Sequence, residues 1–389
     1  MCPPAIEEWS HPMDVSFLAP VFSAAGPYAT VCADVTHTTE NADTELELRV
    51  RAIAERLSGQ GAPEGVVAAV RGRLLEANEG GQIATLRGRA LVVAADGSVV
   101  LDQPLVDQPR QEVAEYSPTP DLMPVLRQLP GRVPHVVALV DRTGGDITYV
   151  GLPGQDGEEE TVEGETFHMR KVKVGGWAHD HWQNSAEQTW EDNADRVAAR
   201  IASYARRLSP RFVLVAGDVR ARQILSDKAD GVWKDLVVTM DEGGRAAGAD
   251  REVVDRRAAE LVAEHEAHEE ADAVEKIQSA AAHGLAVTGT APVVEALRKS
   301  QVETLVLADR PDDEELLVGP SPLLLGTGQG DIEALGVQEV HSVPADRALV
   351  AAAVASDAGV VVVPRSAMPG DIPVAAILRY SDDSTPSPQ

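Results

Sequence analysis

RFVLVAGDVRARQIL, residues 211–225, has the pattern of a buried strand followed by a short helix. VVALVDRTGGDITYVGL at 136–152 predicts two strands around a glycine-containing turn, and LVVTM at 236–240 predicts another strand. Apolar residues at helical spacing predict a long helix from about Ser185 to Leu208. This alternation of strands and helices predicts a three-layer α/β domain.

Similar patterns on both sides of this segment predict further α/β units. YATVCAD at 28–34 predicts a strand. RALVVAADGSVVL at 89–101 predicts a hairpin, because Asp-Gly joins two apolar runs. Residues 252–283 predict a long, highly charged helix, and ETLVLAD at 303–309 predicts a strand after it.

The expected fold class is therefore α/β, with three domains between a loose N-terminal arm and a disordered tail. An aperiodic, proline-rich stretch opens the chain, and the last residues, SDDSTPSPQ, include no apolar side chain. The expected boundaries are 1–20 for the arm, 21–132, 133–250 and 251–380 for the domains, and 381–389 for the tail.

The charge of the chain is strongly acidic overall and basic in one place. Its 389 residues include 34 Lys and Arg against 62 Asp and Glu, a net charge of −28. Phosphate contacts need Lys and Arg, so this value alone argues against binding to nucleic acid. From His168 to Arg222, however, ten basic side chains face six acidic ones, a surplus of four positive charges. The middle domain therefore contains a locally basic strip.

The remaining composition excludes several classes of protein. Cys2 and Cys32 are too few for a Cys₄ zinc site or a disulfide framework. The opening MCPPAIEEWS lacks the pattern of a signal peptide, and the most apolar stretch, 348–364, is short and contains Asp357. We expect a cytoplasmic protein with no membrane partner, no metal ion and no cofactor. Nothing indicates a coiled coil or a symmetric interface, so we expect a monomer.

Two short motifs predict structure rather than chemistry. GTGQG at 326–330 lacks the ending of a P-loop and predicts a surface loop. HEAHE at 265–269 lacks H-E-x-x-H spacing and a third ligand, so it predicts a solvated acidic helix face.

GGWAHDHWQ, Gly175 to Gln183, is the candidate functional segment. It places two Trp and two His in a glycine-led loop after a basic strand, and such side chains can stack on unpaired bases. Trp177 and Trp182 are equally compatible with a role as core aromatics.

Arginines continue this basic strip along the long helix. Arg196, Arg200 and Arg207 share one side of the helix, where they could contact phosphates or pair with Asp192 and Asp195. The candidate RNA-binding residues are Arg170, Lys171, Lys173, Gly175, Gly176, Trp177, His179, His181, Trp182, Gln183, Arg196 and Arg200.

The stretch from Gly175 to Leu225 resembles the middle domain of a known superfamily. It is similar to bacterial relatives of the archaeal and eukaryotic class-1 release factors and Pelota, and more narrowly to the actinobacterial branch related to the ribosome hibernation factor Balon. VEALRKSQVETLVLAD at 294–309 and VAAILRY at 374–380 resemble the ribosomal-protein-L30e-like domain that closes these proteins. PYATVCADVTHTTENAD at 27–43 fits the first domain, so the resemblance covers about residues 20–380.

This resemblance implies a three-domain release-factor-like architecture that binds the ribosome. The binding place would be the aminoacyl-tRNA site, with contacts to 16S and 23S rRNA. The first domain would face the decoding centre and the middle domain the peptidyl transferase centre. In Balon-like proteins elongation factor Tu is the accompanying partner.

One departure from the superfamily bears on catalysis. Release factors carry Gly-Gly-Gln in the middle domain, in the loop before the long helix. Gln183 occupies a similar place, but His181 and Trp182 precede it, and Gly80-Gly81-Gln82 lies in the first domain, where a glycine pair can simply end a helix. Glycines permit backbone conformations and close approaches that residues with a Cβ do not.

We therefore expect a non-enzymatic factor that occupies the aminoacyl-tRNA site and inactivates idle ribosomes under stress. The alternative is a peptidyl-tRNA hydrolase that rescues stalled ribosomes, with Gln183 as the catalytic residue that orients the attacking water. A third hypothesis is a protein-interaction module that uses its acidic surfaces and does not contact RNA.

Overall fold

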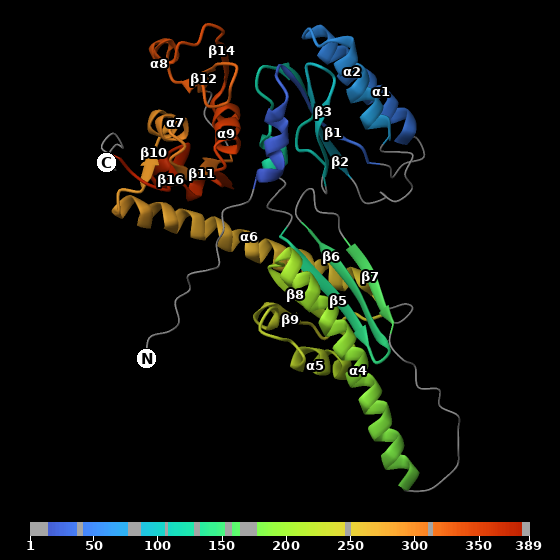
Figure 1. Ribbon diagram of the computed structural model, residues 1–389. Coiled ribbons are helices and arrows are strands. Elements are labelled where there is room, and N and C mark those ends of the chain that lie inside the picture. Colours follow the sequence, from blue (N-terminus) through green and yellow to red (C-terminus); the bar gives the residue numbers. More distant parts are fainter. Residues whose placement is uncertain are drawn as a thin grey trace. The chain divides into compact units, whose positions relative to one another are not determined.

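The computed structural model shows a mixed α/β protein and confirms the predicted fold class (Figure 1). It describes residues 15–36, 42–76, 87–105, 108–127, 133–151, 158–163, 177–245, 250–309 and 314–382. The chain forms two compact units. The terminal unit combines Met1–Gln128 with His268–Gln389, and the middle unit is Leu129–Ala267.

The N-terminal lobe of the terminal unit is an antiparallel sheet with two helices on one face. Its strands, in the order β3-β2-β1-β4, are β1 Tyr28–Asp34, β2 Gly88–Ala94, β3 Val99–Leu105 and β4 Val113–Ser117. The helices are α1 Ala42–Gly59 and α2 Glu64–Glu76, preceded by the 3₁₀ helix η1 Ser16–Ser23. The buried residues of α1 recur every three or four positions, which places them on one stripe against the sheet.

The predicted hairpin at Asp96-Gly97 is confirmed. The strands β2 and β3 pair antiparallel, and Gly97 has a φ of 86°. The carboxylate of Asp96 accepts hydrogen bonds from the backbone N–H and the hydroxyl of Ser98. Local side-chain and backbone chemistry therefore determines this turn.

The C-terminal lobe of the terminal unit holds two sheets. The larger one has the order β10-β16-β11-β15, and the smaller one the order β13-β12-β14. The strands are β10 Ala286–Thr288, β11 Val302–Ala308, β12 Glu315–Val318, β13 Leu325–Gly326, β14 His341–Pro344, β15 Gly359–Val363 and β16 Val374–Leu378. The helices are α7 Thr290–Arg298, α8 Gln329–Ala334 and α9 Ala345–Ala355, with 3₁₀ turns at η3 Arg365–Ala367 and η4 Pro369–Asp371.

The middle unit is a five-stranded sheet in the order β7-β6-β5-β8-β9. The strands are β5 His135–Asp141, β6 Gly144–Val150, β7 Glu158–Glu163, β8 Phe212–Gly217 and β9 Val237–Thr239. Strands β5, β8 and β9 are parallel, and β6 and β7 continue the sheet antiparallel. The helices of this unit are α4 Trp177–Leu208, α5 Val219–Asp227, the 3₁₀ turn η2 Lys234–Leu236 and the part of α6 Arg251–Ala282 up to Ala267. The short helix α3 Met123–Leu126 and the rest of α6 belong to the terminal unit.

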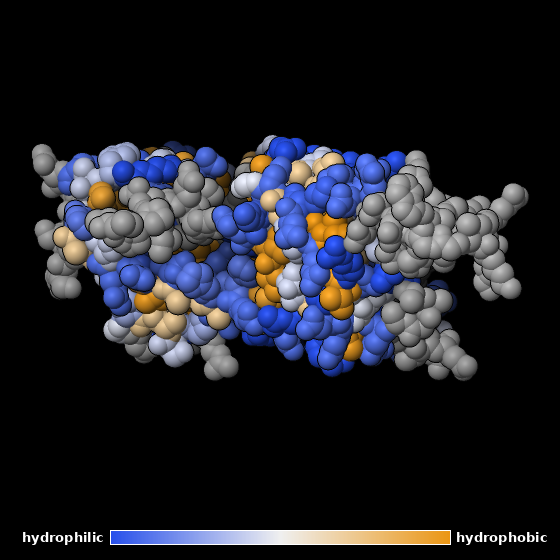
Figure 2. Space-filling model, turned by 90° about the horizontal axis from the view of Figure 1, so that it is seen from below, coloured by the Kyte–Doolittle hydropathy of each residue, from blue (hydrophilic) through white to orange (hydrophobic). Residues whose placement is uncertain are grey.

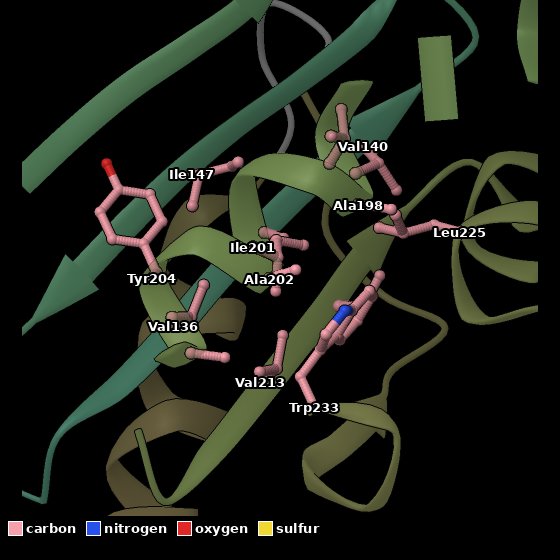
Figure 3. Close-up of a cluster of buried hydrophobic side chains, with 14 of the residues drawn as sticks. Val136, Val140, Ile147, Ala198, Ile201, Ala202, Tyr204, Val213, Leu225 and Trp233 are labelled. Atoms are coloured by element: carbon pink, nitrogen blue, oxygen red, sulfur yellow. The ribbon is translucent and has the colours of Figure 1, made fainter. Parts of the chain in front are cut away.

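Both faces of this sheet are covered, so the predicted three layers are confirmed. Val213 and Val215 of β8 pack with Ile201 of α4, in the cluster that also buries Trp233 (Figure 3). Alternate residues of the same strand, such as Leu214, pack on the other face with residues of α6. A strand buried on both faces needs a continuous apolar run, which is why 212–216 is so hydrophobic.

Two segments are more ordered than their composition indicates. The acidic segment Glu158–Glu163 has the composition of a loop but forms the edge strand β7. The N-terminal arm was expected to be loose up to residue 20, but η1 buries Leu18 and Val21 completely. Residues 1–14 and 383–389 lie outside the described residues.

Figure 2 shows one face on which hydrophobic areas are interrupted by hydrophilic residues. No helix in the part of the chain that the structure describes is both long and apolar enough to cross a membrane.

Candidate nucleic-acid interface of the middle unit

The structure describes only part of the predicted RNA-binding segment. Arg170, Lys171, Lys173, Gly175 and Gly176 lie outside the described residues, as does the tripeptide 80–82. The other candidates belong to helix α4; they are Trp177, His179, His181, Trp182, Gln183, Arg196 and Arg200.

The predicted loop at 177–183 is wrong, because α4 begins at Trp177 and not near Ser185. The two glycines at 175 and 176 are the last helix-breaking residues before it, and no Gly or Pro follows as far as Leu208. Helical spacing therefore places Trp177 and His181 one turn apart, and Gln183 in the second turn.

The first half of α4 extends beyond the sheet. Among the α4 side chains whose burial the structure describes, from Gln188 onwards, those of the hydrophobic core begin at Val197, and Trp190 is only half-buried. At about 1.5 Å per residue, the part before Trp190 is about 20 Å long. Figure 1 shows this part projecting from the middle unit. The residues at 177–183 therefore lie at the tip of a helical projection.

Arg200 is held by a carboxylate of the edge strand. Its Nε donates to Glu160 of β7, and the Tyr204 hydroxyl donates to the same carboxylate over 3.2 Å. The guanidinium lies 4.9 Å from the centroid of the Tyr204 ring. The hydrogen bond to Glu160 raises the pKa of Arg200. Each of the two paired side chains is more than one third exposed, so this ion pair is accessible to a competing phosphate.

The observed partner of Arg200 is not one of the two predicted helix partners. Asp195 binds Lys228 over 2.8 Å, and Arg200 binds Glu160. Arg196 also interacts within the protein. Phosphate binding by Arg196 and Arg200 stays a prediction, and it would require exchange of these contacts.

A second group of charges lies at the carboxyl ends of the parallel strands β5 and β8. Asp218 caps α5 by accepting hydrogen bonds from two backbone N–H groups, and Arg142 lies 3.5 Å from its carboxylate. Arg245 bridges Asp141 and Asp146, at 3.0 Å from each. Burial would raise the pKa of Asp141, but hydrogen bonds from Thr143 and the charge of Arg245 outweigh it and lower the pKa.

These charges neutralise one another within the protein. The guanidinium of Arg142 also stacks on Trp190, 4.5 Å from the ring centroid. Arg222 is buried and donates to the carbonyl of Gly217 and to Asp241. Open α/β sheets bind ligands at this edge, yet each of these arginines already has a protein partner. Within the described ranges, no three His, Cys, Asp or Glu side chains are placed to hold a metal ion.

The sequence gives no signal for this network, because its residues are far apart in the chain. Arg245 lies in EGGRAAGAD, 242–250, whose composition is typical of a linker. Only the fold brings Arg245 to the two aspartates of β5 and β6.

Two histidines flank a buried phenylalanine on the other face of the sheet. The His135 ring stacks on Phe212 with centroids 4.7 Å apart, and His265 of α6 stacks on Phe212 at 5.5 Å. Nδ1 of His135 donates to the carbonyl of Val133 over 2.6 Å. His265 is half-buried, so the prediction that 265–269 forms a solvated face is wrong for this residue.

His135 makes the stability of the middle unit depend on pH. Burial lowers its pKa below the ordinary 6.5, so below that pH the unfolded chain binds a proton that the native state does not. Stability is therefore lost as the pH falls from 7 to 5. His135→Phe is expected to flatten this loss, measured by thermal unfolding at pH 7, 6 and 5.

The matched control is His268→Phe, since the side chain of His268 is 75% exposed. This variant is expected to keep the wild-type pH dependence. If His135→Phe loses as much stability between pH 7 and 5 as the wild type, protonation of His135 does not contribute.

Comparison with known proteins finds a family similar to the middle part and relatives that align with most of the chain. Residues 134–283 match the family model of bacterial archaeo-eukaryotic release factor family 2. Over 364 residues the chain is 26% identical to the uncharacterized proteins Rv2629 and MT2704 of Mycobacterium tuberculosis strains H37Rv and CDC 1551, covering 92% of this chain and 95% of each relative.

Solved structures of archaeal proteins also align with most of the chain. The archaeal translation termination factor aRF1 aligns with 16% identity over 93% of this chain and 96% of its own, at a TM-score of 0.27. Pelota of Archaeoglobus fulgidus aligns with 14% identity over 96% and 95%, at a TM-score of 0.34. The segment 134–283, which contains the sheet of the middle unit and α4, is thus similar in sequence to a bacterial family of release factors.

Proposed function

We propose that this protein binds the ribosome, occupies the aminoacyl-tRNA site and inactivates idle ribosomes without catalysing a reaction. The observation that carries the proposal is the release-factor family match over residues 134–283. That match contains β5 to β9 and the whole of α4, so the similar part is the one that bears the candidate RNA-binding residues.

The projection of α4 supports a role at a recessed RNA site. A helix that leaves its sheet for about 20 Å can reach into a site that the sheet itself cannot enter. In this proposal the residues at its tip, Trp177, His179, His181, Trp182 and Gln183, contact 23S rRNA near the peptidyl transferase centre. Stacking of aromatic side chains on unpaired bases supplies affinity there. Arg170, Lys171, Lys173, Arg196 and Arg200 contact the phosphates.

The proposal also gives the two outer domains separate places on the ribosome and elongation factor Tu as a partner. The first domain, 21–132, faces the decoding centre and its 16S rRNA. The last domain, 251–380, faces the side on which elongation factor Tu binds. The factor acts in the cytoplasm under stress, when idle ribosomes accumulate.

Co-sedimentation with purified ribosomes tests the proposal. The wild-type chain is expected to move with ribosomes in a sucrose gradient at low salt and to dissociate as salt rises, because phosphate contacts release counterions. Lys171→Glu with Lys173→Glu is expected to weaken binding about tenfold or more, by analogy with the loss of two phosphate contacts. Arg256→Glu with Arg257→Glu on α6 is the matched charge control and is expected to leave binding unchanged.

A protein that stays at the top of the gradient at every salt concentration contradicts the proposal. So does an equal loss of binding in the two charge-reversed variants, which would show that the basic strip has no special role.

The position of Gln183 also supports a non-enzymatic factor. It lies in the second turn of α4, after His181 and Trp182, where the backbone is helical. The same ribosomes, loaded with labelled peptidyl-tRNA, are expected to release no label on addition of the protein. Release by the wild type and not by Gln183→Ala would establish the hydrolase instead.

A further inference from the structure

The terminal unit contains a cavity of about 270 Å³ between its two lobes. The N-terminal lobe contributes the end of η1, the start of β1 and the turn 118–120 that follows β4. The C-terminal lobe contributes the segment 318–322 after β12, the start of β14 and one side of α9. Small-molecule sites in proteins measure about 300–1,000 Å³, so this volume, just below that range, suits only a compact organic ligand.

The walls of the cavity are rich in proline. Proline has a fixed φ and no backbone N–H, so proline walls offer carbonyl acceptors without donors. On α9 the wall is made of small residues, Ala348 and Ala351, which leave space. The five prolines of the lining are Pro27, Pro118, Pro120, Pro320 and Pro322.

A close approach at Gly26 shapes the N-terminal wall. A Cβ on Gly26 would lie 2.9 Å from the carbonyl oxygen of Pro118 and 2.8 Å from the ring of Tyr28. The absence of a Cβ at Gly26 therefore allows the carbonyl of Pro118 and the ring of Tyr28 to approach this closely at the cavity. The Tyr28 hydroxyl donates to the carbonyl of Ala24 over 2.7 Å, so this donor is not available for a hydrogen bond to a ligand.

Aromatic rings and a carboxylate give the cavity a preference for positive charge. Phe22 and Tyr28 meet edge to face, with centroids 6.5 Å apart. The faces of such rings attract cations. Glu339 lies at the rim, with its carboxylate 3.5 Å from Nε2 of His341, and its side chain is 78% exposed. The net charge of −28 adds a long-range attraction for cations.

We propose that this cavity binds a small organic cation with an apolar body. The apolar body packs against the prolines and the alanines of α9. The ammonium group points to the rim, where Glu339 and the backbone carbonyls accept its hydrogen bonds. An anion finds no basic side chain other than His341 among the lining residues.

Calorimetric titration of the full chain with tryptamine and tryptophol tests the proposal at pH 7.5. The two probes share the indole ring and differ in an ammonium against a hydroxyl. Tryptamine is expected to bind with one site per chain, and tryptophol at least tenfold more weakly. Glu339→Gln is expected to weaken tryptamine binding about fivefold, as suits an exposed charge, and to leave tryptophol binding unchanged.

Two further variants separate the cavity from the rest of the surface. Glu303→Gln removes an exposed carboxylate outside the cavity and is expected to leave both titrations unchanged. Ser321 is exposed at the mouth, so Ser321→Trp is expected to abolish tryptamine binding while the circular dichroism spectrum stays that of the wild type.

The proposal is overturned if tryptamine gives no binding heat at millimolar concentration. It is also overturned if tryptophol binds as tightly as tryptamine, or if Glu303→Gln weakens binding as much as Glu339→Gln.

Discussion

Replacing Gly217 with alanine is expected to destabilise the middle unit by about 3 kcal/mol or more, one of the largest effects of any single substitution in the chain. Gly217 has a φ of 124°, and a Cβ there would lie 1.9 Å from the carbonyl oxygen of Val140 on the neighbouring parallel strand. That same carbonyl accepts a hydrogen bond from the backbone N–H of Asp218. The new methyl group therefore forces β5 and β8 apart where their ladder ends.

Thermal unfolding followed by circular dichroism measures the effect, and limited proteolysis shows which unit opens. Gly231→Ala is the matched control, because a Cβ at Gly231 meets no atom within 4 Å. It is expected to change stability by less than about 0.5 kcal/mol. Wild-type stability in Gly217→Ala would mean that the strands have space for the methyl group.

The elements that the sequence predicts correctly are those whose pattern is set by burial. Residues 212–216 are continuously apolar because both faces of β8 are covered. The pattern can be recognised without knowing which helices cover the two faces. The hairpin at Asp96-Gly97 is equally local, since its hydrogen bonds stay within a few residues.

The elements that the sequence does not predict depend on contacts with residues far away in the chain. Glu158–Glu163 is rich in acid and has no apolar alternation, yet it pairs with β6, and Glu160 gains Arg200 as a partner. Charged residues are common on edge strands, where one side stays in water. The position of Arg245 also depends on contacts with distant residues, because its two aspartate partners are about 100 positions away in the chain.

The sequence singles out residues 177–183 as candidates but does not predict that they lie on a helix. The aromatic and histidine side chains at 177–183 are candidate RNA contacts because of their residue types alone. The spacing of their neighbours gave no signal for a helix before Ser185, because polar residues dominate a helix that does not pack on a core. A projecting helix therefore looks like a loop when only hydrophobic periodicity is considered.

Replacing Arg347 with alanine is expected to destabilise the terminal unit by about 2–4 kcal/mol. Arg347 lies on α9 with its side chain 15% exposed, 2.7 Å from Glu115 of β4 and 3.6 Å from Asp121. The side chain of Asp121 is only 13% exposed. Burial raises its pKa, and the charge of Arg347 opposes that rise. Without Arg347, the two lobes lose a shared ion pair and a buried carboxylate loses its cation.

The pH dependence distinguishes this mechanism from a simple loss of packing. A carboxyl whose pKa is raised by folding lowers stability above that pKa, and the penalty disappears once the group is protonated. The loss caused by Arg347→Ala is therefore expected to be largest near pH 7 and to shrink towards pH 4, measured by thermal unfolding. Arg73→Ala, which breaks an exposed pair with Glu76, is the matched control and is expected to cost less than about 0.5 kcal/mol at either pH.

A double-mutant cycle with Asp121→Asn completes the test. If the uncompensated charge of Asp121 carries the loss, Arg347→Ala is expected to cost less in the Asp121→Asn background than in the wild type, by about 1–2 kcal/mol. Equal costs in the two backgrounds would show that Arg347 stabilises the lobes through its packing on α9 and through Glu115 alone.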